Sequence, residues 1–307
     1  MLWPPIVSNT RPLRLLVSKP MSTDLLSLSH SLENILVARN LRGMQAVQSA
    51  LTPGYCLRAA QLLRNKAGHI LIGTGFPVVD TFETDGPVGA IALYETLAYL
   101  GAKPVIVCGQ PIVGALTEKY HTHEIKVGEH NQREAEAKQA LAHYNPDAII
   151  SIERPGQAAD GGYYNMRGED ISARTACFDS FITQAQCPTI GIGDGGNEIG
   201  MGKVSAALQA LNIVPAVTSC DELLVADVSN WGAYGLIAFL SLWHNEDLLG
   251  RIDPLTILNY LSKLGSVDGV TRINELTEDG LPPSEGLAVI AEIRQAMGFL
   301  EATESEC

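Results

Sequence analysis

The chain has 307 residues, of which 46% are hydrophobic and 18% charged, and its formal net charge is −13. This length suits one large domain or two ordinary ones. The acidic balance, without a cluster of basic residues, argues against a nucleic-acid partner, because binding a phosphate backbone requires a positively charged face. No apolar run reaches the roughly 18 residues that a membrane-spanning helix needs, so no membrane partner is expected.

Residues 1–21 contain several prolines and no acidic residue. We predict that they form a disordered tail, although a targeting segment would also be poor in acidic residues. Residues 22–307 are predicted to form a single domain. The cysteines are scattered and include no C-x-x-C pair, so they are expected to be reduced thiols in a cytoplasmic protein.

The hydrophobic pattern first predicts two helices, over residues 22–39 and 52–64, that form an N-terminal helical cap. Short Val/Ile-rich runs then alternate with helical patterns. The predicted strands cover residues 69–76, 104–109, 123–127, 147–153, 188–193 and 214–219. The predicted helices cover residues 85–103, 131–143, 171–186, 232–243, 254–264 and 284–297.

This alternation predicts an α/β fold: a mostly parallel sheet with helices on both faces, in a Rossmann-like three-layer arrangement. The segment 232–243 is almost wholly apolar, which fits the core of the domain better than the interface of a homo-oligomer. The oligomeric state is left open.

Polar residues follow four of the predicted strands, where parallel sheets bind their ligands. We expect these residues to share one crevice: Glu83, Asp85, Glu153, Arg154, Arg167, Asp194, Asn197, Glu198, Asp227 and Asn230. Each also has a purely structural interpretation. Asp85 is as well placed to cap a helix, and either arginine could pair with a neighbouring glutamate.

The most unusual stretch is "PTIGIGDGGNEIGMGK", residues 188–203. It satisfies G-x-G-x-x-G after a strand, which raises the alternative of an enzyme that binds NAD or ATP through the loop from Gly191 to Gly202. The acidic residue expected about 20 positions later is poorly placed at Asp221, and Asn197 stands where a P-loop needs glycine. Asp194 and Glu198 would also repel a pyrophosphate.

Carboxylates on a glycine-rich loop instead suit an ammonium group or a hard divalent cation such as Mg²⁺ or Mn²⁺. We assign Asp194, Glu198 and Asp227 as candidate metal ligands. Zinc is disfavoured, because His121 and His123 have no third ligand nearby in the sequence. No G-x-S-x-G motif is present, which disfavours a serine hydrolase.

Four blocks of the sequence resemble the D-glutamate cyclase family: "GTGFPVVDTFETDGPVGAIAL", "SIERPGQAADGGYYNMRGEDIS", "TIGIGDGGNEIGMG" and "VADVSNWGAYGL". The similarity runs from about residue 51 to 297. Mammalian members carry this domain as the C-terminal part of a mitochondrial protein, whereas this chain looks like a stand-alone microbial form. The resemblance implies dehydration of D-glutamate to 5-oxo-D-proline, with an amino acid as the small-molecule substrate.

For such a reaction we expect Glu153, Asp194, Asn197 and Glu198 to form the catalytic centre. Arg154 and Arg167 would clamp substrate carboxylates, because guanidinium groups bind them bidentately. Asp85, Gly195, Gly196 and Asn230 would complete the substrate site, with free backbone N–H groups donated by the two glycines.

Two further alternatives stay open beside the nucleotide enzyme. A non-catalytic amino-acid-binding protein would need the same kinds of groups. A racemase-like enzyme would need two facing thiols, but Cys108, Cys177 and Cys187 do not form a convincing pair.

Overall fold

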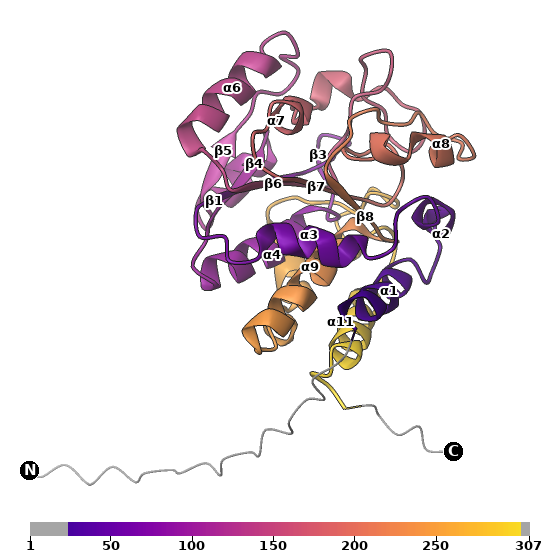
Figure 1. The fold of residues 1–307 in the computed structure, drawn as a ribbon. Coiled ribbons are helices and arrows are strands. Elements are labelled where there is room, and N and C mark those ends of the chain that lie inside the picture. The colour runs from indigo at the N-terminus through magenta and orange to yellow at the C-terminus, as the bar shows by residue number, and fades with distance from the viewer. Residues whose placement is uncertain (1–23, 302–307) are drawn as a thin grey trace, which may run out of the picture.

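The computed structural model describes residues 24–301, so the tail predicted over residues 1–21 lies outside the described part (Figure 1). Its centre is a six-stranded sheet in which every pairing is parallel. The strand order is β5-β4-β1-β6-β7-β8. These strands are β1 (His69–Thr74), β4 (Lys103–Cys108), β5 (Thr122–Glu124), β6 (Ala148–Ile152), β7 (Thr189–Gly193) and β8 (Glu222–Val225).

This strand order is the doubly wound order of Rossmann-like folds, which confirms the predicted fold class. The chain first builds outward from β1 through β4 to β5. It then returns to the other side of β1 and builds β6, β7 and β8. The direction therefore reverses between β1 and β6, and a crevice is expected beyond the carboxyl ends of these two strands.

Helices cover both faces of the sheet (Figure 1). One face carries α3, α4 and α9, and α1 and α11 form a further layer outside α9. The opposite face carries α6 and α7, which contact each other. The bounds of these helices are α1 (Leu25–Leu36), α3 (Tyr55–Leu63), α4 (Pro87–Tyr99), α6 (Arg133–Tyr144), α7 (Asp179–Thr183), α9 (Ser229–His244) and α11 (Pro283–Ala296).

Shorter elements complete the fold. They are α2 (Met44–Gln48), a small antiparallel hairpin of β2 (Pro77–Val78) and β3 (Thr81–Phe82), α5 (Ile112–Leu116), α8 (Ser205–Leu208) and α10 (Pro254–Lys263). Three short 3-10 helices are η1 (Ser172–Arg174), η2 (Gly202–Val204) and η3 (Leu249–Arg251).

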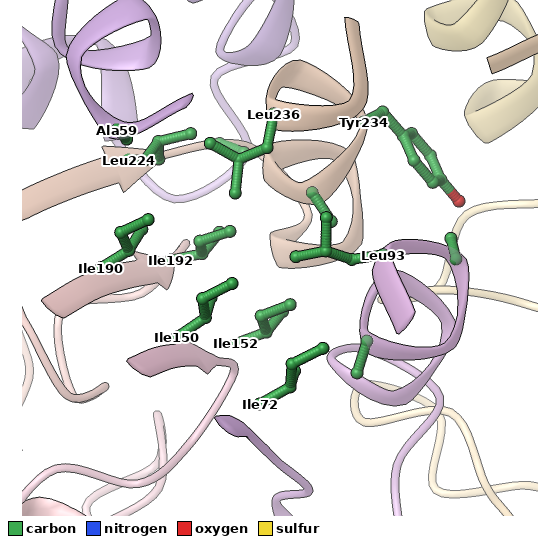
Figure 2. Packing of buried hydrophobic residues seen from close by; sticks show 14 of the residues in the cluster. Ala59, Ile72, Leu93, Ile150, Ile152, Ile190, Ile192, Leu224, Tyr234 and Leu236 are labelled. Atoms are coloured by element: carbon green, nitrogen blue, oxygen red, sulfur yellow. The ribbon is translucent and has the colours of Figure 1, made fainter. Parts of the chain in front are cut away.

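The core lies between the sheet and helices α4 and α9 (Figure 2). The register aligns isoleucines across neighbouring strands, so that Ile150 pairs with both Ile72 and Ile190. These side chains are fully buried. Burial of one such side chain contributes roughly 1.5–3 kcal/mol. These rows of buried isoleucines therefore fix the position of the strands and of the polar residues that follow the strand ends.

The apolar segment predicted over 232–243 lies within α9, and this helix is buried along nearly its whole length. The prediction that it belongs to the core is confirmed. No helix among residues 24–301 is long and apolar enough to cross a membrane. The oligomeric state stays open.

Two predicted elements were wrong. Residues 214–219 do not join the sheet; they fold over the loop after β6, where Val217 N donates to Gln157 O at 2.8 Å. The last strand is β8, a few residues later. The predicted helix 171–186 is also interrupted between η1 and α7, and there the buried Ala176 carbonyl accepts a hydrogen bond from Arg154.

Candidate active site

Three carboxylates meet beyond the carboxyl ends of β1, β6 and β7. Glu153 directly follows β6, Asp194 directly follows β7, and Asp85 precedes the first residue of α4. One carboxylate oxygen from each lies within 4.8 Å of the other two. All three side chains are buried, and Asp194 is fully inaccessible to solvent. The sequence placed these three residues at strand ends, and the topology brings them together at the crevice.

Backbone geometry sets the position of this trio of Asp85, Glu153 and Asp194. Glu153 has a φ of 45°, a left-handed conformation that is uncommon for a residue with a side chain and is found at functional sites. Gly86 lies opposite with a φ of 89°. A Cβ atom on Gly86 would stand only 2.7 Å from the Glu153 Cβ, so glycine is required for this close approach.

Fixed donors orient two members of the trio. Asp85 accepts hydrogen bonds from the backbone N–H groups of Ser229 (2.9 Å) and Asn230 (2.8 Å), at the start of α9. The Ser229 hydroxyl donates to Glu153 Oε2 at 2.6 Å. The start of α9 therefore holds both carboxylates in defined orientations. This N-terminus is the positive end of the helix dipole, which favours the negative charge of the two carboxylates.

The third member is held by Arg42, a residue that the sequence analysis did not single out. Its Nη1 donates to Asp194 Oδ1, and its two terminal nitrogens bind both oxygens of Asp279 at 2.9 and 2.8 Å. Arg42 lies between α1 and α2, outside the strand ends on which the prediction concentrated. Asp279 is in a turn shortly before α11, and the sequence analysis did not single it out either.

The buried carboxyl groups strongly influence one another. Burial, reinforced by the neighbouring carboxylates, raises the pKa of Glu153 and of Asp85 well above their ordinary values. Burial raises the pKa of Asp194 as well, despite the opposing effect of Arg42. Burial also disfavours the charge of Asp279, but Arg42, together with hydrogen bonds that involve Asp194 and Asp85, holds the pKa of that carboxyl below its usual value. Asp279 is thus the fixed anion that anchors Arg42.

A cavity of about 360 Å³ opens beside this centre. Its buried carboxylates, which we call the acidic floor, are those of Glu83, Glu153 and Asp279. Its outer part, which we call the arginine rim, consists of Arg167, Arg174 and Arg272. The remaining lining includes Arg42 and Asn197 and an apolar wall of Phe76, Pro77, Val78, Val79, Met166 and Val270.

The rim belongs to long loops. Arg167 donates to the Val270 carbonyl at 3.0 Å, and Arg174 donates to the Val79 carbonyl. Within residues 24–301 neither forms an ion pair, whereas Arg272 pairs with Glu169 at 2.7 Å. Arg167 and Arg174 therefore have charge available for an anionic ligand. The sequence identified Arg167 but missed Arg174 and Arg272, since no motif marks them.

Two of the predicted site residues, Asn197 and Arg167, line the cavity. Asn197 donates to the Tyr164 carbonyl at 2.9 Å, and its Oδ1 is buried without a hydrogen-bond partner among the described residues. This oxygen is an unused acceptor beside the cavity.

Other predicted site residues hold the backbone instead. Arg154 is buried and donates to the carbonyls of Thr74, Gly75 and Ala176, and it does not line the 360 Å³ cavity. Glu198 accepts the N–H groups of Gly195 (2.9 Å) and Gly196 (2.8 Å). These two N–H groups are therefore already engaged within the loop, contrary to the expectation that they are free donors.

Asn230 and Asp227 also contact backbone. Asn230 Oδ1 accepts the N–H groups of Gly86 and Gly89 at 2.8 and 2.7 Å, which satisfies the start of α4. Asp227 accepts the N–H groups of Arg39 (2.7 Å) and Leu41 (3.2 Å), so it positions the loop that carries Arg42. Asp227 lies outside the trio that meets around Asp194.

The geometry also bears on the two alternative enzyme classes. The glycine-rich segment after β7 turns back through a bridge between Glu198 and Pro155 and does not lead directly into a long helix whose N-terminus could face a phosphate. None of the cysteines among residues 24–301 lines the 360 Å³ cavity. A thiol pair for racemisation is therefore not found at this site.

Comparison with known proteins identifies the family of the chain. Residues 32–294 match the family described as D-glutamate cyclase-like, C-terminal, and the chain belongs to this family. The human protein "D-glutamate cyclase, mitochondrial" is 33% identical over 216 residues. That match covers 62% of this chain and 35% of the human protein, so the chain corresponds to about a third of this relative's length.

A solved structure of an exopolyphosphatase-related protein from Bacteroides fragilis matches with a TM-score of 0.41 at 10% identity. It covers 83% of this chain and 62% of its own.

Proposed function

We propose that the protein is a lactam-forming hydro-lyase that converts D-glutamate to 5-oxo-D-proline. The observation that carries the proposal is the division of one cavity into an acidic floor and an arginine rim, in a member of the D-glutamate cyclase-like family. This division is complementary to a small zwitterion that carries an additional carboxylate. The proposed location is the cytoplasm, supported by the free cysteines of the described part.

The charges define how the substrate would lie. Its ammonium group faces Glu83 and Glu153 on the floor, where the Asn197 Oδ1 can accept a further hydrogen bond. Its α-carboxylate faces Arg167 and Arg174 on the rim, since guanidinium groups bind carboxylates strongly. The γ-carboxyl group folds back toward Arg42. This curled shape brings the amine close to the γ-carbon, and such positioning supplies much of the rate acceleration in intramolecular reactions.

The proposed reaction needs no external reagent. A floor carboxylate accepts one ammonium proton, and the free amine attacks the γ-carboxyl carbon to form the C–N bond. The nitrogen then loses a second proton. One γ-oxygen leaves as water with two protons, so the ammonium and the carboxylate become a lactam and one water. Arg42 stabilises the negative charge on the γ-oxygens during attack.

The product identifies the function. The purified protein is incubated with D-glutamate, L-glutamate or D-aspartate, and the mixture is analysed by chiral chromatography and mass spectrometry. We expect 5-oxo-D-proline, lighter than the substrate by one water, from D-glutamate at a rate far above that without protein. D-aspartate is the matched control, since its shorter chain would form a strained four-membered ring. Binding of D-glutamate without product would instead identify an amino-acid-binding protein.

A further inference from the structure

We propose that Asp85, Glu153 and Asp194 together bind one hard divalent cation, Mg²⁺ or Mn²⁺, below the acidic floor of the cavity. This inference deepens the proposed function, on which it rests for the reaction that the cation serves. The ligand set differs from the predicted one of Asp194, Glu198 and Asp227 by two members. Glu198 is engaged by backbone N–H groups, and Asp227 lies with the loop before Arg42.

The first argument is geometric. One oxygen from each of the three carboxylates lies within 4.8 Å of the other two. Oxygen ligands on opposite sides of an ion are separated by about 4.2 Å for Mg²⁺ and about 4.8 Å for Ca²⁺, twice the metal–oxygen distance. The three oxygens can therefore share one ion with only small movements.

The second argument is an unused acceptor. Asp194 is fully buried, and its Oδ1 accepts from Arg42, but its Oδ2 has no hydrogen-bond partner among residues 24–301. A buried carboxylate oxygen without a partner is costly. A cation among the three carboxylates would satisfy this oxygen and leave the Arg42 contact in place.

The third argument concerns the outer contacts of the ligands. Each carboxylate is already oriented by a donor outside the trio: Asp194 by Arg42, Glu153 by the Ser229 hydroxyl, and Asp85 by the N–H groups of Ser229 and Asn230. Metal-binding carboxylates are typically held in this way. Asp194 Oδ2 is left without a hydrogen bond among the described residues, and Asp85 Oδ2, which accepts one N–H group, has a second lone pair for an ion.

Access separates a metal ion from the substrate's ammonium group. Glu153 lines the cavity, whereas Asp85 and Asp194 are buried behind it. An ammonium group is attached to the rest of its substrate and must stay in the cavity, beside Glu83 and Glu153. A bare ion has no such attachment and can reach all three carboxylates. The positive charge of the cation, bound behind Glu153, would offset part of the negative charge of the γ-carboxylate in the cavity. The γ-carbon would then be attacked more readily by the amine.

Direct binding of Mn²⁺ tests the inference without substrate. The full chain is dialysed against EDTA and then titrated with MnCl₂, while electron paramagnetic resonance follows the signal of free Mn²⁺. We expect one bound Mn²⁺ per chain and competition by Mg²⁺. The variants Asp85→Asn and Asp194→Asn should each bind Mn²⁺ at least about tenfold more weakly. Circular dichroism and thermal melting check that each variant is folded.

Asp179→Asn is the matched control, because Asp179 is a buried aspartate outside the trio that binds Gln157, Tyr163 and Thr218. It should bind Mn²⁺ like the unchanged protein. Absence of Mn²⁺ binding, or an equal loss of binding in Asp179→Asn, overturns the inference. Because the titration contains no substrate, its failure is distinct from a failure to form the lactam. Equal lactam formation before and after EDTA treatment would contradict only the catalytic role of the cation.

Discussion

The acidic floor and the arginine rim face the same cavity but are built differently. The floor stands at strand ends and in buried turns, and Asp279 is fixed there by two hydrogen bonds from Arg42. The rim stands on long loops, and Arg167 and Arg174 reach only backbone carbonyls among the described residues. We therefore propose a division of labour in which the floor performs the chemistry and the rim selects a ligand with a carboxylate.

The largest effect is expected from Asp194→Asn, just below the floor. Loss of this carboxylate should lower the rate of lactam formation by on the order of a thousandfold. The melting temperature should change by less than about 3 °C, because Arg42 keeps both bonds to Asp279 and one buried negative charge is removed. Product assays and thermal melting measure the two effects. Turnover near the original rate would exclude Asp194 from the mechanism.

Arg42→Met should cause the largest loss of stability. Arg42 is the cation that contacts both Asp194 and Asp279, and its removal leaves two buried carboxylates unpaired. Breaking a buried ion pair from one side typically costs about 3–5 kcal/mol. Urea unfolding measures the free energy of unfolding. The matched change Arg167→Met on the rim should stay within about 0.5 kcal/mol, and equal losses in the two variants would refute the distinction between floor and rim.

Glu278 provides a pH test beneath the floor. It accepts a hydrogen bond from Asn230 at 2.7 Å, and burial raises its pKa from 4.5 to about 7. The folded state therefore holds this proton more tightly than the unfolded state. Its contribution to stability is fully present below about pH 4.5 and is lost as the pH rises through about 7, a change of about 3 kcal/mol at most.

Glu278→Gln keeps an acceptor for Asn230 and removes this titration. Relative to the unchanged protein, the variant should gain stability between pH 4.5 and 7 and then keep a constant advantage. Denaturant unfolding at a series of pH values measures the difference between the two proteins. Parallel curves over this range would show that Glu278 does not titrate there.

The smallest effect is expected on the rim itself. Arg174→Met should raise the KM for D-glutamate about tenfold, which corresponds to about 1.4 kcal/mol of lost binding, and should change kcat much less. Arg174 donates to one backbone carbonyl and lies at the surface, so the fold should tolerate the change. A loss confined to kcat would move Arg174 from binding to chemistry.

The sequence predicted the parts of the site that depend on strand ends. Glu153 and Asp194 each follow a Val/Ile-rich strand directly, and the parallel arrangement then requires that they lie close together. The hydrophobic pattern likewise predicted the sheet and the buried helix α9. These features are set by local patterns and by one rule of topology.

The rest of the site depends on contacts between distant segments. Arg42 and Asp279 are 237 residues apart, and no local pattern pairs them. The sequence pattern also could not show which polar side chains would form their hydrogen bonds with backbone groups instead of facing the cavity. Glu198 and Arg154 have the right chemistry and position, but the first binds its own loop and the second binds three carbonyls. The strand expected at 214–219 was wrong because a short run of apolar and β-branched residues also suits a segment that packs over a loop.

An isotope experiment tests the central claim, lactam formation by attack on the γ-carboxyl carbon, most directly. D-glutamate labelled with ¹⁸O on both γ-carboxyl oxygens is incubated with the protein, and the mass of the product is measured. We predict 5-oxo-D-proline that retains one heavy oxygen, with the other released as water. A lactam without any heavy oxygen, or no lactam above the protein-free control, would contradict the account.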